Sequence, residues 1–359
     1  MKIQHTILAA ALLAAMSAQA QTNFSVYGNA DLAVNNFTTK NTTGVKTEEN
    51  NIVAGGLSTS NIGFRGDREI SKGLKATFQF EFEVDQTSDT GIVKTRAGLV
   101  GLAGDMGAVT IGRRTTLVKA TVDALDAGDG FNTAGFVGDN ARDSRLNDRL
   151  TFTTPVYSGF SADVQLGFGA TVRETSAAGV VSTSKDGTTE DSSSYGLNYA
   201  NGPLTVRWVT ETIKNYSKAV KVGAGDNLVY ELAKPTAIAD RKNDAFGATY
   251  DFGVAKLFFV DTKMKQGTDA TLVSFNTQTV GARVPFGDYT LVVEGGTGKA
   301  KLTNSSVKAD MSAYQMALLY TFAKDTTLYA AYGFESISHP TFTNKGKQTN
   351  TQVGLRYKF

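Results

Sequence analysis

Strict alternation of apolar and polar side chains is the feature that most limits what this chain can fold into. It is clearest in residues 74–84, where Leu74, Phe78 and Phe82 share one face while Lys75 and Glu81 share the other. A two-residue repeat belongs to a β-strand, because successive side chains of a strand point to opposite sides of the sheet. The same repeat recurs along most of the chain and predicts an all-β fold.

Sixteen segments carry this repeat, and the gaps between them tend to alternate between short turns and long loops. The expected strands are residues 23–34, 56–67, 73–85, 92–103, 107–114, 147–155, 159–172, 192–201, 203–214, 243–252, 254–264, 273–284, 287–299, 310–323, 325–337 and 350–359. An even number of strands, with short turns at one end and long loops at the other, is typical of outer-membrane barrels. We therefore predict a transmembrane antiparallel β-barrel of 16 strands with up-and-down topology.

The two ends of the chain agree with this prediction. Residues 1–20 combine Lys2, a short apolar run and an Ala-Gln-Ala cleavage site, which predicts a signal peptide and leaves residues 21–359 as one barrel domain. The last strand alternates up to Phe359, and a closed barrel needs this strand complete so that it can pair with the first. We expect Tyr357 and Phe359 to form the assembly signal for the outer-membrane assembly machinery.

Composition excludes several other classes of protein. The 359 residues contain no Cys and only two His, so disulfides, thiol catalysis and multi-histidine metal sites are ruled out or nearly so. The formal net charge of +2 gives no bulk attraction for nucleic acid. We expect no catalytic residue, no metal, no cofactor and no nucleic-acid partner.

The chemistry of the two strand faces separates a membrane barrel from a soluble one. The polar faces are rich in Thr, Ser, Gln, Gly and Arg, and the apolar faces in Phe, Val, Leu, Ala and Tyr. A barrel of this size leaves a wet lumen, so we expect the polar faces inside and the apolar faces against lipid. Aromatic residues near strand ends are expected to form girdles; they are Tyr27, Tyr157, Phe160, Tyr199, Tyr250, Phe252, Tyr320, Phe322, Tyr357 and Phe359. A soluble β-sandwich or surface adhesin also alternates and is the competing interpretation.

One long loop, residues 115–146, carries both acidic and apolar side chains. Asp123, Asp126 and Asp129 lie within seven residues, close to Val122 and Leu125. A loop of this length with apolar residues of its own is usually ordered and functional. We expect it to fold into the lumen, pack its apolar side on the wall and form a constriction.

Five arginines have the phase of lumen-facing residues and could face that loop. They are Arg65, Arg96, Arg114, Arg145 and Arg149. Arginine stays charged in any environment, and rings of charged side chains set the selectivity of pores. Guanidinium groups opposite loop carboxylates would produce a transverse field that favours polar solutes. The competing interpretation is that some of these arginines are surface charges of turns or loops.

Six stretches of the chain, taken in order, resemble a known family. They are FSVYGNAD (24–31), SNIGFRG (60–66) with GLKA (73–76), GAVTIGR (107–113), DALD (123–126), TPVYSGF (154–160) and GLRYKF (354–359). This set resembles the general diffusion porins of Gram-negative bacteria, in particular the beta-proteobacterial type.

The resemblance implies a homotrimer in the cell outer membrane, in contact with lipid and lipopolysaccharide. It implies passive diffusion of small hydrophilic solutes and ions through a pore narrowed by the third loop. Arg65, Arg96 and Arg145 match the family's basic cluster, and Asp123 and Asp126 match its acidic loop.

Other functions remain to be weighed against a general porin. A substrate-specific channel on the same barrel would need a binding track along the lumen, which the sequence does not exclude. An outer-membrane hydrolase barrel would use a histidine near its rim. The histidine left after removal of the signal peptide is His339, in an expected external loop. We therefore predict that the protein is not an enzyme.

Overall fold

The computed structural model describes residues 22–89, 91–128, 145–169, 171–175, 181–185, 191–216, 220–222, 230–233, 239–267, 273–301 and 308–359. The expected signal peptide, residues 1–20, lies outside these ranges. Strands account for nearly all regular structure in the described residues, and one helix, α2 (Leu117–Ala124), follows the sixth strand. No described segment forms a helix long and apolar enough to cross a membrane.

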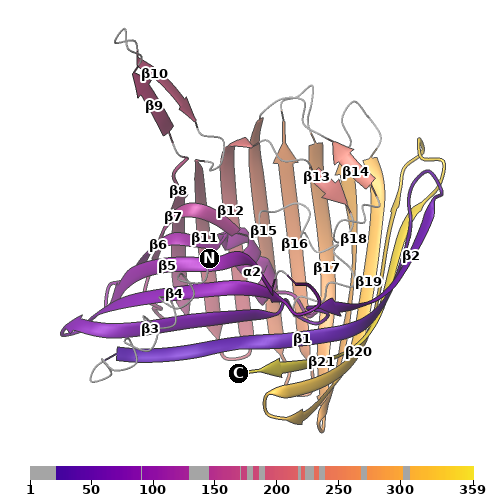
Figure 1. The fold of residues 1–359 in the computed structure, drawn as a ribbon, viewed down its shortest axis with the longest axis horizontal. Coiled ribbons are helices and arrows are strands. Elements are labelled where there is room, and N and C mark those ends of the chain that lie inside the picture. The colour runs from indigo at the N-terminus through magenta and orange to yellow at the C-terminus, as the bar shows by residue number, and fades with distance from the viewer. Residues whose placement is uncertain are drawn as a thin grey trace.

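The strands surround a central space that contains α2 (Figure 1). They are β1 (Thr22–Lys40), β2 (Lys46–Ala54), β3 (Asn61–Ser71), β4 (Leu74–Asp85), β5 (Gly91–Gly104), β6 (Gly107–Thr115), β7 (Arg145–Thr153), β8 (Phe160–Gly167), β11 (Ser192–Asn201), β12 (Leu204–Tyr216), β15 (Ala239–Asp251), β16 (Lys256–Gln266), β17 (Val273–Phe286), β18 (Tyr289–Lys301), β19 (Lys308–Ala323), β20 (Thr326–Ser338) and β21 (Gly346–Lys358). Two further hairpins, β9 (Thr171–Thr175) with β10 (Val181–Lys185) and β13 (Val220–Val222) with β14 (Tyr230–Ala233), form separate sheets.

The main sheet is antiparallel and closes on itself. Strand β21 pairs with β1 from Asn29↔Lys358 to Lys40↔Lys347. Strands β2 and β3 pair with the two successive halves of β1, on its other side, and so together occupy one position in the wall. The barrel therefore has the 16 strand positions that the sequence predicts, with neighbours in sequence adjacent in space.

The second barrel strand differs from its expected boundaries. We expected a strand at 56–67 after a loop at 35–55, but β1 continues to Lys40, β2 covers Lys46–Ala54 and β3 begins at Asn61. Most side chains of β2 are exposed on both faces. A strand that is exposed on both faces needs no apolar face, so alternation does not reveal it. The β13–β14 hairpin likewise lies within a stretch that we expected to be a long loop. The β9–β10 hairpin lies mostly within another, but β9 begins inside the strand that we expected at 159–172.

The outer surface of the barrel carries the apolar faces of the strands. Val100 and Leu102 of β5, Trp208 of β12 and Val280 of β17 are all exposed there. Aromatic rings pair near the short turns, as in Phe160–Tyr199, where the ring centroids are 4.5 Å apart. One expected girdle residue, Tyr27, instead points inward, because its hydroxyl bonds side chains of β4.

Candidate functional site: a constriction inside the barrel

The long third loop begins as a short helix directly after β6. Thr116 caps α2, because its side-chain oxygen accepts a hydrogen bond from the backbone N–H of Lys119 at 3.2 Å. Threonine is a favoured N-cap residue because it satisfies one of the free N–H groups of the first turn. Leu117, Val118 and Val122 of this helix are buried, so α2 has one apolar face.

The apolar face of α2 packs against the inner wall. Val118, Val122 and Leu125 form a buried cluster with Val209 of β12 and Val260 of β16. Burying one such side chain contributes about 1.5–3 kcal/mol, so this contact favours the inward position of the loop. The loop folds inward as the sequence predicts, and part of the inner wall is consequently apolar rather than polar.

Two glycines of the wall let the loop approach closely. A Cβ atom on Gly281 of β17 would lie 2.5 Å from the Cβ of Ala127. A Cβ on Gly247 of β15 would lie 2.8 Å from a methyl carbon of Leu125, as well as against the backbone of β16. Any larger residue at these positions must displace the loop or the neighbouring wall.

Polar contacts fix the end of the described part of the loop. Arg283 of β17 donates from Nε to the carbonyl of Ala127 at 2.7 Å. Glu294 of β18 accepts from the N–H of Gly128 at 3.0 Å and from the amide of Gln315 at 3.2 Å. Arg283, Glu294 and Gln315 were not predicted from the sequence. The sequence feature that could have revealed them is a charged or amide side chain on the inward face of a strand whose other inward residues are small or apolar.

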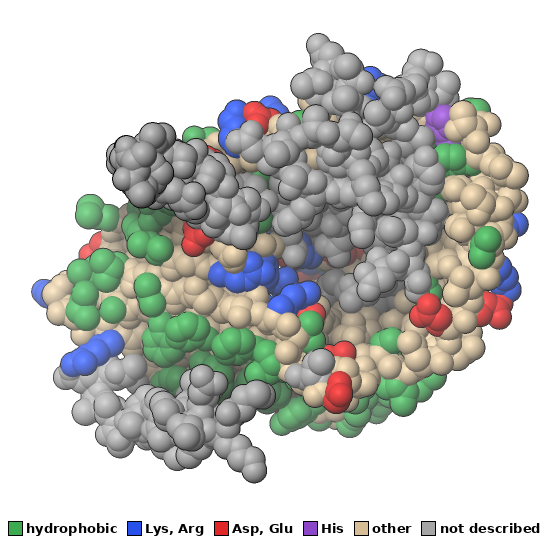
Figure 2. Space-filling model, turned by 45° about the horizontal axis from the view of Figure 1, so that its top comes forward, with side chains coloured by type: hydrophobic (Ala, Val, Ile, Leu, Met, Phe, Trp, Pro, Cys, Tyr) green, Lys and Arg blue, Asp and Glu red, His purple; other side chains and the backbone are tan. Residues whose placement is uncertain are grey.

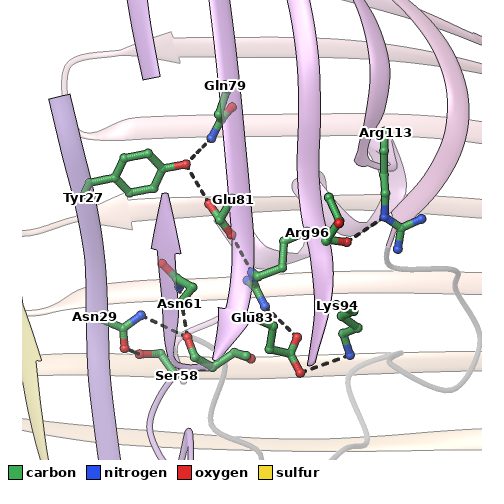
Figure 3. Close-up of polar contacts among 12 residues, drawn as sticks. Tyr27, Asn29, Ser58, Asn61, Gln79, Glu81, Glu83, Lys94, Arg96 and Arg113 are labelled. Carbon is green, nitrogen blue, oxygen red and sulfur yellow. Dashed lines mark hydrogen bonds and ion pairs between the residues drawn. The ribbon is translucent and has the colours of Figure 1, made fainter. Parts of the chain in front are cut away.

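The opposite wall carries a ladder of charged and polar side chains (Figure 3). Tyr27 of β1 accepts from Gln79 at 2.5 Å and donates to Glu81 of β4 at 2.9 Å. Arg96 of β5 pairs with Glu81 at 2.5 Å and with Glu83 at 3.3 Å. The ladder continues through Lys94, whose Nζ lies 3.2 Å from Glu83.

A β-bulge directs Arg96 into the lumen. Glu81 pairs with Ala97, and the next residue of β4, Phe82, pairs with Thr95, so Arg96 is one residue in excess. Bulges near functional sites commonly re-aim a side chain in this way. Without the bulge Arg96 would share a face with Val100, which is exposed on the outer surface.

Three more arginines join this side of the lumen. Arg65 of β3 lies over the ring of Tyr27, with its guanidinium carbon 5.0 Å from the ring centre. Arg113 of β6, which was not among the arginines predicted from the sequence, donates to the carbonyl of Thr95 at 2.7 Å. Arg145 of β7 lies in the electrostatic field of Arg96, Glu81, Glu83 and Asp123. We call Arg65, Lys94, Arg96, Arg113 and Arg145 the basic arc.

The two other predicted arginines lie elsewhere on the inner wall. Arg114 of β6 donates to Thr110 at 2.6 Å, and Asp163 of β8 lies within its electrostatic reach. Arg149 of β7 is almost completely buried, and a Cβ on Gly167 would collide with its guanidinium. Unlike the basic arc, Arg149 therefore presents almost no surface to solvent.

The loop acids do not all face the basic arc. Asp123 is exposed and forms a 2.6 Å ion pair with Lys119 of the same helix. Asp126 accepts from the N–H of Gly128 at 2.6 Å and contacts Glu294 of β18, on the far side of the barrel from Arg96. Asp129 lies outside the described residues. The carboxylates nearest to Arg96 are Glu81 and Glu83 of β4, for which the sequence predicted only a place on a polar strand face.

The pore is thus bordered by two unlike surfaces: the basic arc, and the side of α2 that faces away from the wall on which the helix packs. Figure 2 shows basic side chains beside the hollow at the centre and hydrophobic side chains over the lower outer surface. Among the described residues, no group of three or more His, Cys, Asp or Glu is arranged to hold a metal ion. The arrangement can select solutes by size and charge.

Comparison with known proteins decides the family. Residues 7–340 match the Gram-negative porin family. The chain belongs to this family. It is 29% identical to outer membrane porin protein 32 of Delftia acidovorans over 99% of this chain and all of that protein. It is 26% identical to an outer membrane porin protein of Bordetella pertussis, with 99% of this chain and 100% of that protein covered.

The fold of this porin also matches solved structures. The anion-selective porin from Comamonas acidovorans superposes with a TM-score of 0.73 at 22% sequence identity, covering 94% of this chain and 100% of that one. The protein is therefore a porin of the Gram-negative outer membrane, a channel for the passive diffusion of small hydrophilic solutes, and not an enzyme.

Proposed function

We propose that flow through this porin is controlled between the basic arc and α2, and that the pore passes anions in preference to cations. The charge balance of the wall carries this proposal: five basic side chains of the arc stand against Glu81 and Glu83, an excess of three positive charges. Charged rings of this kind set ion selectivity in pores.

The helix opposite adds little net charge. Lys119 and Asp123 pair with each other, and Asp126 is turned toward the wall. The field in the water between the two surfaces is therefore dominated by the basic arc. That the solved porin from Comamonas acidovorans is described as anion-selective supports the same preference for this chain.

Reversal potentials in a salt gradient test the proposal. The triple variant R96Q/R113Q/R145Q should lose anion preference, because each charge near the ion path changes the ion's energy by about 1 kcal/mol at 4 Å in water, or about fivefold in partitioning. Arg68 provides the control: it lies three residues after Arg65 and so on the other face of β3. R68Q should leave the reversal potential unchanged. An unchanged reversal potential in the triple variant would contradict the proposal.

A substrate-specific channel remains the second candidate, favoured by one cavity near the end of the pore where the short turns lie. This cavity of about 550 Å³ is lined by Ser25, Arg65, Asp67 and Gln79, and also by Phe24 and Phe78, which stack on the outer face. Conductance that rises linearly with salt concentration supports the general pore. Saturation, or block by one anionic solute, would support a specific channel.

We also propose a homotrimer with its contact on the outer face of β1, β3 and β4. Phe24 stacks with Phe64 and Phe78 at centroid distances of 6.4 and 6.3 Å, and Phe78 lies 6.2 Å from Phe80. These four rings form one continuous apolar surface, which the same surface of a neighbouring copy would cover in the trimer. Unheated protein in detergent should migrate as a trimer on a gel and as a monomer after heating, and F80A should weaken the trimer band.

Lipopolysaccharide is the proposed partner of the outer surface near the long loops. Lys242 of β15 lies directly opposite Lys265 of β16, and Lys301 of β18 directly opposite Lys308 of β19. Like charges in register are unfavourable by themselves, and bound phosphates would relieve them. K242Q/K265Q should reduce the lipopolysaccharide that copurifies with the trimer, whereas unchanged copurification would contradict this assignment.

The chain end is the proposed signal for the outer-membrane assembly machinery. Phe359 exchanges backbone hydrogen bonds with Gly28 of β1 at 2.9 and 3.1 Å, and its ring lies 6.2 Å from that of Tyr357. Closure of the barrel and recognition by the machinery would thus use the same residues. F359A should lower the folded yield in cells more than the yield of refolding in detergent.

A further inference from the structure

The break between β2 and β3 sends a short segment into the barrel. Leu32 of β1 pairs with Ala54, and Asn29 pairs with Asn61, so residues 55–60 stand opposite only two residues of β1. Six residues cannot fit in the plane of the wall at that place. They turn inward, where Leu57 is completely buried among inward-facing side chains that include Ala33 and Tyr329. We call residues 55–60 the inner segment.

A buried carboxylate holds the inner segment in place. Asp31 of β1 accepts hydrogen bonds from the backbone N–H groups of Leu57 at 3.0 Å and Ser58 at 2.7 Å. Its other oxygen accepts from the hydroxyl of Tyr329 at 2.6 Å. Arg356 of β21 is its register partner across the sheet and supplies a compensating positive charge. A buried carboxylate needs such partners, because an unpaired one is costly.

Glycines leave room for this arrangement. A Cβ on Gly56 or on Gly354 would each lie 2.3 Å from the hydroxyl oxygen of Tyr329. The inner segment therefore sits tightly against Tyr329. Leu57 belongs to the same buried apolar cluster as Ala127 of the third loop. The inner segment and the constriction loop thus share one strip of the inner wall.

The far end of the inner segment borders the ladder of charges. Asn29 and Asn61 both donate to the carbonyl of Thr59 at 3.0 Å, and Val84 donates to that of Ser60. Asn61 is the register partner of Glu83, which pairs with Arg96 and Lys94. Figure 3 shows Asn29, Ser58 and Asn61 beside these side chains. Ser58 and Thr59 are partly exposed, in contrast to the buried Leu57.

We propose that the inner segment is a second inward border of the constriction and that Asp31 is the positioning residue that holds it there. The pore would then be narrowed by two chain segments, the third loop and residues 55–60, both anchored on the same apolar strip. This inference rests on the proposed constriction between the basic arc and α2. It assigns to Asp31, which is fully buried, a role in setting the width of the pore.

The absence of cysteine allows a direct test by introducing a single thiol. In the otherwise unaltered chain, T59C treated with a negatively charged, water-soluble methanethiosulfonate should show a stepwise partial loss of single-channel conductance. The matched control is T321C on β19, near a short turn and away from the constriction. Modification of that thiol should leave the conductance unchanged.

Removal of the clamp tests the role of Asp31. D31A should increase conductance and current noise, and T59C in the D31A background should lose its sensitivity to the reagent. D31N keeps one acceptor for the N–H groups of Leu57 and Ser58. In this background T59C should regain most of its sensitivity to the reagent. Heat-modifiable gel mobility identifies any variant that fails to fold. If D31A does not fold, the response of T59C to the reagent still tests whether the inner segment borders the constriction.

Two outcomes separate this inference from the proposed function. If modified T59C conducts normally while R96Q/R113Q/R145Q shifts the reversal potential, the inner segment does not border the constriction and the inference is wrong. If neither changes, the constriction itself is misplaced. Block of T59C that persists unchanged in D31A would show that Asp31 does not position the segment.

Discussion

The inner faces of β3–β7 and of β12–β19 lie on opposite sides of one barrel but carry different chemistry. The first holds the ladder of Glu81, Arg96 and Glu83, where ion pairs face the lumen. The second holds Val209 and Val260, buried beneath α2. Strands with the same alternation therefore face water in one arc and a packed loop in the other.

Under the proposed function, this difference is what turns a 16-strand barrel into a narrow pore. One arc buries apolar area and thereby fixes the third loop, while the other arc keeps its charges exposed to the lumen, where we propose that they act on passing ions. Neither arc would give selectivity alone, because a charged wall without the loop would border a wide channel. Three perturbations test this division, beginning with the largest expected effect.

Displacement of the loop from its arc should have the largest effect. G281V places side-chain atoms where Ala127 packs, and overpacking of this kind costs about 1–3 kcal/mol. The loop should shift toward the lumen, and single-channel conductance should fall. G295V is the matched control, since a Cβ on Gly295 of β18 would have no atom closer than 3.7 Å and its side-chain neighbour there is Tyr314. Equal conductance in the two variants would mean that the loop does not rest on β17.

Removal of the acids from the charged arc should have an intermediate effect. E81Q/E83Q leaves Arg96 and Lys94 without their partners and raises the local positive charge. Anion preference should rise by about fivefold for each charge within about 4 Å of the ion path, and less at greater distance. The reversal potential in a salt gradient measures the change. A shift toward cations would contradict the assignment of these residues to the lumen.

The exposed ion pair on α2 should matter least. D123N removes the ion pair between Asp123 and Lys119, but pairs of this kind contribute about 0–1 kcal/mol and are screened by salt. We expect a small increase in anion preference at low salt that disappears at high salt. Measurement of the reversal potential at two ionic strengths checks this, and an effect larger than that of E81Q/E83Q would reverse the order proposed here.

The sequence predicted the architecture because membrane and lumen impose alternation on nearly every strand. It also predicted that residues 117–125 fold inward, since their apolar side chains needed a surface to cover. It could not locate β2, whose two faces are both exposed. A strand exposed on both faces lacks the apolar and polar alternation on which the prediction depends.

The site was harder to predict because it depends on departures from regular pairing. Arg96 was predicted to face the lumen from its phase, but in regular pairing its phase is that of the outward-facing Val100. It lies on the predicted side only because of a bulge, which counting residues along the sequence cannot detect. Asp126 turns to the wall because its partners, Gly128 and Glu294, become neighbours only in the folded barrel. The contacts of Asp31 with Leu57 and Tyr329 likewise join residues that are far apart in the chain.

Thiol accessibility in reconstituted vesicles tests the contrast between the two arcs most directly. Gln79 lies on the ladder of the charged arc, and Val260 lies beneath α2, where it is 2% exposed. A water-soluble thiol reagent should label Q79C rapidly and V260C hardly at all. Labelling of V260C as fast as Q79C would show that the loop does not cover this arc, and the two-sided pore would have to be abandoned.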